Sequence, residues 1–230
     1  MRVAGNFWGD NMKYHLIEKA HQKKTNWSGG ETTEIFIYPE HANYAERQFS
    51  WRVSSATVEN EESEFTPLYG IKRWIMPLDA PLLLKHRNQQ KLLYEILVKP
   101  YEAHCFKGDW DTKSIGVTRD FNLMLREGSY GILKHFKLAK EIDVDIESIF
   151  PEIFDNRLVL IDKLFTLGVY CIAGQYRAHL GDSDIPVKSS ELLLVDNDSK
   201  MIREYKTLSV SQQNVNFLDL VVFFVAYDAE

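Results

Sequence analysis

The sequence has no excess of positive charge and no apolar stretch long enough to form a membrane-spanning helix. Its 230 residues carry a formal net charge of −6, and no stripe of lysine and arginine follows the chain. Binding to nucleic acid through bulk electrostatics is therefore not expected. The longest uninterrupted apolar run, Leu220 to Tyr227, falls far short of the roughly 20 residues that a membrane helix needs.

Cysteine is scarce as well. Cys105 and Cys171 are the only two, and both lie within apolar stretches. Residues Met1 to Asp10 lack the apolar core of a signal peptide. Without a sign of secretion, two buried thiols are favoured over a disulfide, although counting two cysteines does not exclude one. We expect a cytoplasmic protein.

Signatures of metal binding and of nucleophilic catalysis are missing too. None of the seven histidines forms a His-x-His pair. Glu102 and His104 would share one face of a strand, but they lack the further ligands that a zinc site requires. The motif Gly-x-Ser-x-Gly is absent, and neither cysteine has a catalytic signature around it. We expect no metal, no cofactor and no covalent nucleophile.

What the sequence does contain is a series of short strands. Hydrophobic residues make up 45% of the chain and charged residues 26%, as in an ordinary globular protein. Runs rich in β-branched and aromatic residues alternate with glycine and proline turns, which predicts an all-β sandwich or barrel. The expected strands are Thr32–Tyr38, Phe49–Val58, Arg73–Met76, Leu82–Lys85, Leu92–Val98, Ser114–Val117, Phe121–Leu125, Ile132–Leu138, Leu158–Ile161, Val169–Ala173, Tyr176–Leu180, Glu191–Val195 and Asn216–Tyr227. Helical pattern is confined to Asn11–Lys19 and a short turn near Ile146–Phe154.

Two stretches repeat one order of elements. Arg73 to Gly108 and Val169 to Asn197 both contain strand, turn, strand, loop, strand and polar turn. A duplicated barrel would produce this repeated order, and so would any β-meander. Our hypothesis is duplication, with residues 1–130 and 131–230 forming two barrels that complete a single unit.

Alternation places polar side chains on one face of three strands, since successive residues of a strand point to opposite faces. The three sets are Thr32, Glu34, Phe36 and Tyr38; Arg52, Ser54, Ala56 and Val58; and Asp120, Asn122, Met124 and Arg126. A solvated outer face is the common outcome for such a pattern. A barrel interior lined with converging polar groups is the other, and alternation alone leaves both open.

Five motifs follow in a fixed order between Trp27 and Arg126. They are WSGG before TTEIFIYP, then FSWRVSSA, then SEFTPLYG before Arg73, then FKGD, and last DFNLM. This ordered set resembles the HutD/Ves family, although the chain has Ser28-Gly29-Gly30-Glu31 in place of the Asn-Gly-Gly-Gly form of the first motif. The resemblance implies a cupin-like, RmlC-like jelly-roll β-barrel duplicated as a bicupin. It also implies a link to histidine utilisation, in which family members look like regulators or sensors of a pathway intermediate.

The candidate ligand-binding residues are Thr32, Glu34, Arg52, Ser54, Arg73, Asp120 and Asn122. Each arginine can offer a planar fork to a carboxylate. Asp120 and Asn122 can accept from, and Asn122 can donate to, an imidazole, amide or formimino group. Such a set suits a small anionic, nitrogen-containing molecule such as urocanate or an N-formyl- or formimino-glutamate. The alternative for each arginine is a structural ion pair with Glu34 or Asp120.

Three functions stay open at this point. The first is a small-molecule-binding regulatory or sensor protein, which could form a homodimer. The second is a metal-free cupin enzyme, an isomerase or lyase acting on a small carboxylate with Asp120 or Glu34 as acid and base. The third is an interaction module that uses an exposed sheet edge. A closed cavity with a raised carboxylate pKa would favour the enzyme, and an open sheet without a cavity would favour the interaction module.

Overall fold

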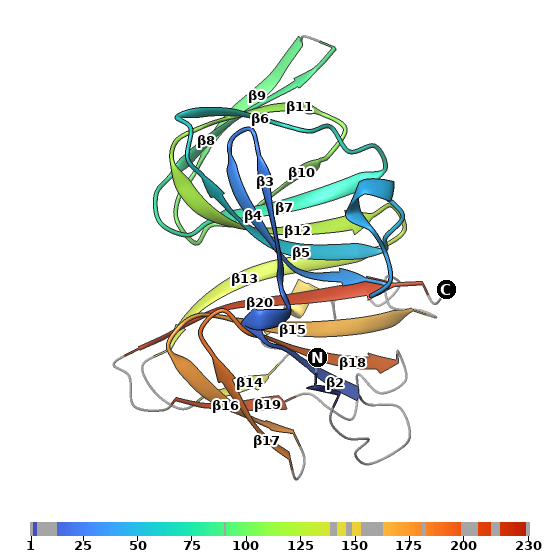
Figure 1. Ribbon diagram of the computed structural model, residues 1–230, viewed down its shortest axis with the longest axis vertical. Helices are drawn as coiled ribbons and strands as arrows, with labels where there is room; N and C mark the ends of the chain where they lie inside the picture. The colour runs from blue at the N-terminus through green and yellow to red at the C-terminus, as the bar shows by residue number, and fades with distance from the viewer. Residues whose placement is uncertain are drawn as a thin grey trace. The chain divides into compact units, whose positions relative to one another are not determined.

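The computed structural model describes residues 2–3, 13–89, 91–138, 142–145, 149–152, 163–180, 183–198, 207–212 and 217–228 (Figure 1). Within them the regular elements are strands and two short 3-10 helices, η1 (Lys19–His21) and η2 (Tyr44–Glu46), and Ile149, Pro151 and Glu152 are helical. The all-β prediction is confirmed. The helix expected over Asn11–Lys19 is wrong, because Lys13–Ile17 forms a strand. The expected strand Leu158–Ile161 and most of the turn near Ile146–Phe154 lie outside the described residues.

The chain divides into two compact units. One comprises Gln22–Ser129, and the other comprises Tyr130–Glu230 together with Met1–His21. The division after Ser129 lies beside the expected boundary, but the first 21 residues group with the later half. The reason is strand pairing: β2 (Lys13–Ile17) runs antiparallel to β18 (Leu192–Asp198).

The unit Gln22–Ser129 contains two antiparallel sheets (Figure 1). The order is β10-β7-β12-β5-β4-β3 in the six-stranded sheet and β6-β11-β8-β9 in the four-stranded sheet. Their bounds are β3 Lys23–Trp27, β4 Gly30–Tyr38, β5 Trp51–Val58, β6 Glu62–Phe65, β7 Ile71–Pro77, β8 Leu82–Asn88, β9 Lys91–Val98, β10 His104–Lys107, β11 Asp111–Ile115 and β12 Thr118–Arg126. Apolar residues of both sheets meet between them, in a cluster of Ile75, Leu82, Leu84, Val98 and Phe106.

The other unit also contains a six-stranded and a four-stranded sheet. Their orders are β1-β2-β18-β15-β20-β13 and β14-β19-β16-β17. The bounds are β1 Arg2–Val3, β13 Tyr130–Leu138, β14 Ile142–Asp145, β15 Leu164–Ala173, β16 Gln175–Leu180, β17 Ser183–Lys188, β19 Thr207–Gln212 and β20 Leu218–Tyr227, in addition to β2 and β18. Strand β20 is buried along its whole length, which fits its place between β15 and β13.

The two units repeat one topology. The neighbours β10-β7-β12-β5 and β6-β11-β8-β9 of the first unit correspond, eight strands later, to β18-β15-β20-β13 and β14-β19-β16-β17 of the second. The repeated order of elements expected in Arg73–Gly108 and Val169–Asn197 therefore corresponds to β7–β10 and β15–β18. This is a jelly-roll module of two sheets that occurs twice, as the bicupin hypothesis predicts.

One bulge changes the predicted alternation. The register between β4 and β5 shifts between Glu34 and Phe36, so that Glu34 pairs with Ser54 but Phe36 pairs with Val53. Phe36 and Tyr38 consequently share the face of Trp51, whose ring lies 5.1 Å from that of Phe36. The prediction that Thr32, Glu34, Phe36 and Tyr38 lie on one face is wrong, because a bulge adds a residue to one strand.

Two further expectations concern the cysteines and the membrane. Both cysteines are free; Cys171 is buried and Cys105 is partly buried. In the described parts of the chain, no helix is long and apolar enough to cross a membrane.

Candidate functional site

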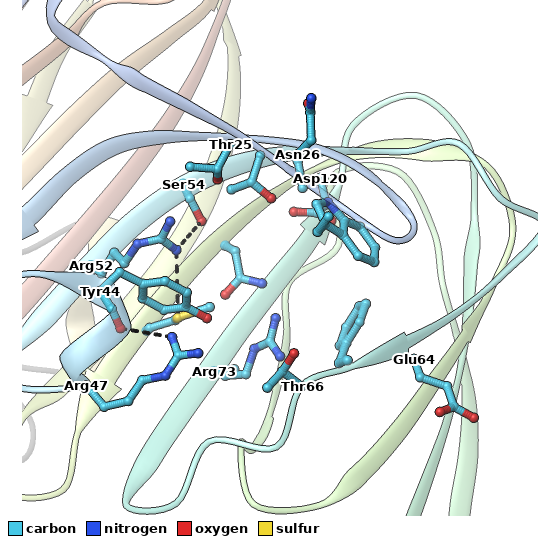
Figure 2. A pocket seen from close by; sticks show the side chains of 16 residues that line it. Thr25, Asn26, Tyr44, Arg47, Arg52, Ser54, Glu64, Thr66, Arg73 and Asp120 are labelled. Carbon is cyan, nitrogen blue, oxygen red and sulfur yellow. Dashed lines mark hydrogen bonds between the residues drawn. The ribbon is translucent and has the colours of Figure 1, made fainter.

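A cavity of about 330 Å³ lies inside the unit Gln22–Ser129 (Figure 2). Six of the seven predicted ligand residues line it: Thr32, Arg52, Ser54, Arg73, Asp120 and Asn122. The seventh, Glu34, lines a neighbouring hollow that shares Arg52 and Tyr44 with the cavity. The face predicted to be either solvated or interior is therefore an interior one.

Four neighbouring strands position these side chains, and Thr32 of β4 is opposite Ala56 of β5. β12 pairs with β5 on one side, where Asn122 is opposite Ser54, and with β7 on the other side, where Met124 is opposite Arg73. Paired residues of adjacent strands point to the same face of a sheet. The side chains of these strands thus converge on one side, which explains why alternation along β5 and β12 identified Arg52, Ser54, Asp120 and Asn122.

Arg52 is held by protein partners. Its Nε donates to Glu34 Oε2 at 2.7 Å, and its Nη1 donates to Ser54 Oγ at 3.0 Å. The guanidinium also lies 4.1 Å from the centre of the Tyr44 ring, an arrangement that Figure 2 shows from the cavity side. The structural ion pair is therefore the correct interpretation for the Nε of Arg52, and its charge is matched by that of Glu34.

Arg73 differs, because its Nε is buried and has no hydrogen-bond partner among the described residues. Its guanidinium stacks on aromatic rings instead, 4.6 Å from the centre of Phe65 and 5.4 Å from that of Phe106. Burial lowers the pKa of Arg73 to about 10, while Tyr44 and Asp120 oppose the shift. Arg73 still carries its charge at neutral pH, and that charge has no ion-pair partner within 4.0 Å among the described residues.

Asp120 and Asn122 each present an unpaired acceptor. The Oδ1 atoms of both side chains are buried and have no partner among the described residues. Burial raises the pKa of Asp120 to about 7, against the opposing effects of Arg73 and of the Ala56 backbone N–H. An unsatisfied buried polar group costs about 1–3 kcal/mol, so native structures rarely keep one without a function or an unseen partner.

Sequence reasoning missed several residues of the cavity. Trp27, from the end of β3, lines it and carries a buried indole Nε1–H without a partner in the described structure. Tyr44 reaches it from η2, where the Asn43 side chain accepts from the Ala45 N–H at 3.0 Å. Both were overlooked because a hairpin end and a loop place them, and no strand alternation predicts such positions. The only sequence signal was the Trp27 of the first motif.

Gly30 is needed for the hairpin that carries Trp27. Its φ is +149°, and a Cβ at this position would lie 1.9 Å from the carbonyl oxygen of Thr57. Only glycine tolerates such a close approach of two backbones. The β3–β4 connection consists of Ser28 and Gly29, and Gly30 begins β4.

The expectation that Glu102 and His104 share one face of a strand is wrong, because β10 begins only at His104. Glu102 precedes β10 and its side chain accepts from the backbone N–H of Lys99. Within the described residues, no group of three or more His, Cys, Asp and Glu side chains could hold a metal ion.

Comparison with known proteins gives the relationship of the chain. The sequence model of the HutD family matches residues 19–144, which is more than half of the chain. No curated protein matches it.

Solved structures with the same fold span nearly the whole chain. The conserved protein of unknown function PA5104 from Pseudomonas aeruginosa PAO1 has a TM-score of 0.66 at 15% identity, over 94% of this chain and 99% of that one. HutD from Pseudomonas fluorescens SBW25 has a TM-score of 0.59 at 19% identity, over 91% of this chain and 97% of that one. YhhW from Escherichia coli has a TM-score of 0.58 at 8% identity, over 94% and 98%. Identities this low support the shared fold alone.

Proposed function

The chain belongs to the HutD family, and from this premise we propose that it is a small-molecule-binding regulatory or sensor protein of histidine utilisation. Its ligand is a small anionic molecule that contains nitrogen, such as urocanate or an N-formyl- or formimino-glutamate. The pathway comes from the family, and the chemistry of the ligand comes from the cavity.

The observation that carries the proposal is a set of four buried, unpaired polar atoms around one cavity. Two are donors, Trp27 Nε1 and Arg73 Nε, and two are acceptors, Asp120 Oδ1 and Asn122 Oδ1. Buried polar groups normally form hydrogen bonds, so these four atoms favour a ligand whose acceptors and donors pair with them. A carboxylate would accept from the two donors, and an N–H group would donate to the two acceptors.

The charge of the cavity favours an anion. Glu34 matches the charge of Arg52, whereas Arg73 keeps its charge without an ion pair. Because the pKa of Asp120 is about 7, this carboxyl is only partly ionised at neutral pH. The cavity of about 330 Å³ lies at the lower end of the range of about 300–1,000 Å³ for small-molecule sites, which suits a ligand of amino-acid size.

A thermal-shift screen of histidine-pathway intermediates tests the proposal. A ligand at about 100 times its Kd stabilises the folded protein by about 3 kcal/mol, which is readily measured as a rise in Tm. We expect Arg73→Gln to abolish the shift and Lys72→Gln to preserve it, since Lys72 is exposed on the opposite face of β7. Arg52→Ala should abolish it as well, through loss of the Ser54 and Tyr44 contacts. The proposal fails if none of these compounds raises the Tm of the wild-type protein.

A second candidate is a metal-free cupin enzyme with Asp120 as acid and base. The pKa of about 7 favours it, because general acid–base catalysis is most effective when the pKa is near the working pH. Following each bound compound by NMR distinguishes the candidates: a sensor leaves the compound unchanged, whereas an isomerase or lyase converts it and Asp120→Asn stops the conversion. The hypothesis of an interaction module predicted an open sheet without a cavity, so the presence of the cavity argues against that hypothesis.

A further inference from the structure

A second cluster of polar side chains lies in the same unit, separated from Arg73 by the ring of Phe106. His86 of β8, Tyr94 of β9 and His104 of β10 meet beside the ring of Phe106. We propose that these three side chains form a binding site for a divalent transition-metal ion such as Zn²⁺ or Cu²⁺. The proposal is independent of the small-molecule site, because none of the three residues lines that cavity.

Two distances between donor atoms, both measured to His104, suit a single metal ion. The Nε2 atoms of His86 and His104 are 3.2 Å apart, and Tyr94 Oη is 3.4 Å from His104 Nε2. In a tetrahedral site with bonds of about 2.0 Å, two ligand atoms are about 3.3 Å apart. The separation of the imidazole nitrogens corresponds to an angle of about 105° at such an ion. A fourth position would remain for water.

The protonation of the histidines also suits a metal. His86 Nδ1 lies 2.9 Å from Thr112 Oγ1, and this hydroxyl donates to the carbonyl oxygen of Trp110. The hydroxyl can then accept from His86 Nδ1–H, which leaves the Nε2 lone pair directed at His104. A neighbour that fixes the tautomer in this way is typical of metal-ligating histidines.

Without a metal, the two imidazoles share one hydrogen bond. With the proton of His86 on Nδ1, the donor in this hydrogen bond is His104 Nε2–H. A metal ion bound by both Nε2 atoms requires His104 to carry its proton on Nδ1 instead. Tyr94, which is 36% exposed, would lose its phenol proton to solvent when it binds as phenolate. Its exposure also gives the ion a path into the site. Cys105 follows His104 on β10 and therefore points to the opposite face, so it is not a ligand.

Metal titration of the chelator-treated full-length protein tests the site. We expect one equivalent of Co²⁺ to bind and to give the intense visible absorption of a tetrahedral complex. His104→Ala should weaken the affinity at least about 100-fold, since second-shell changes alone cost about 10- to 100-fold. With Cu²⁺, the wild-type protein should show a phenolate-to-copper charge-transfer band, and Tyr94→Phe should remove it.

The matched control is His179→Ala in the other unit. His179 is partly exposed and lies 3.6 Å from Asp184, so it represents surface binding by a histidine beside a carboxylate. Far-UV circular dichroism confirms that each variant is folded. Thr112→Val is a second variant, which removes the hydroxyl beside His86 Nδ1 and leaves the three ligands in place. The proposal is overturned if the wild-type protein binds no ion, if His104→Ala binds with unchanged affinity and spectrum, or if His179→Ala removes the binding.

Discussion

Replacing Asp120 with asparagine should stabilise the protein, and more so as the pH rises. In the folded state the pKa of Asp120 is raised from 3.8 to about 7 by burial. Between about pH 4 and pH 7, Asp120 is therefore protonated in the folded protein but ionised in the unfolded chain. As a result, the free energy of unfolding falls as the pH rises from about 4 to about 7. The full difference corresponds to about 4 kcal/mol, of which about 3 kcal/mol develops between pH 5 and pH 8. Asparagine has a similar shape and no charge, so the Asp120→Asn protein does not lose stability in this way as the pH rises.

Urea denaturation followed by tryptophan fluorescence at pH 5 and pH 8 measures the effect. Burial lowers the pKa of His86 to about 4, so below about pH 6.5 this histidine is protonated more readily in the unfolded chain than in the folded protein. The free energy of unfolding therefore also falls as the pH drops below about 6.5. Subtracting the wild-type free energy of unfolding from that of Asp120→Asn cancels His86, because both proteins contain it. The difference should grow by about 3 kcal/mol between the two pH values. If it is the same at both, Asp120 ionises normally in the fold and its burial does not raise its pKa.

Three other substitutions test the packing. Gly30→Ala should lower the free energy of unfolding by about 1–3 kcal/mol, because a Cβ there meets the Thr57 carbonyl; an unchanged urea midpoint would contradict the hairpin geometry. Glu34→Ala should cost about 3 kcal/mol by leaving the buried charge of Arg52 without its partner, and the loss should persist in high salt if the pair is buried. Gly168→Ala should cost about 1–3 kcal/mol in thermal denaturation, because its Cβ would overlap the ring of Phe223; full stability would mean that this ring can move aside.

The sequence predicted the fold class and six of the residues that line the cavity, and the reason is physical. Side chains alternate along a strand, so Arg52 and Ser54, or Asp120 and Asn122, had to share a face wherever their strands lay. Whether that face was solvated or interior depended on a second sheet covering it, which a single strand does not reveal. The bulge after Glu34 broke the same rule and moved Phe36 to the other face.

Contacts between distant strands lay beyond sequence reasoning. The histidine spacing offered no metal motif, yet the pairing of β8 with β9 and the approach of β10 bring His86, Tyr94 and His104 together. Likewise, the two arginines looked equivalent as ligands for a carboxylate. The fold separates them, since only Arg52 is placed beside Glu34, and Arg73 is left with the unpaired Nε.

Isothermal titration calorimetry with urocanate, N-formylglutamate and formiminoglutamate tests the central claim most directly. One of these compounds, or a close analogue with a carboxylate and an N–H group, should bind the wild-type protein with one site per chain. Arg73→Gln should weaken that binding about 10- to 100-fold, as expected for the loss of a charged hydrogen-bond donor, and Lys72→Gln should leave it unchanged. Binding of equal strength to the wild-type and Arg73→Gln proteins would contradict the account, because the ligand would then lie outside the cavity of Arg73, Asp120 and Asn122.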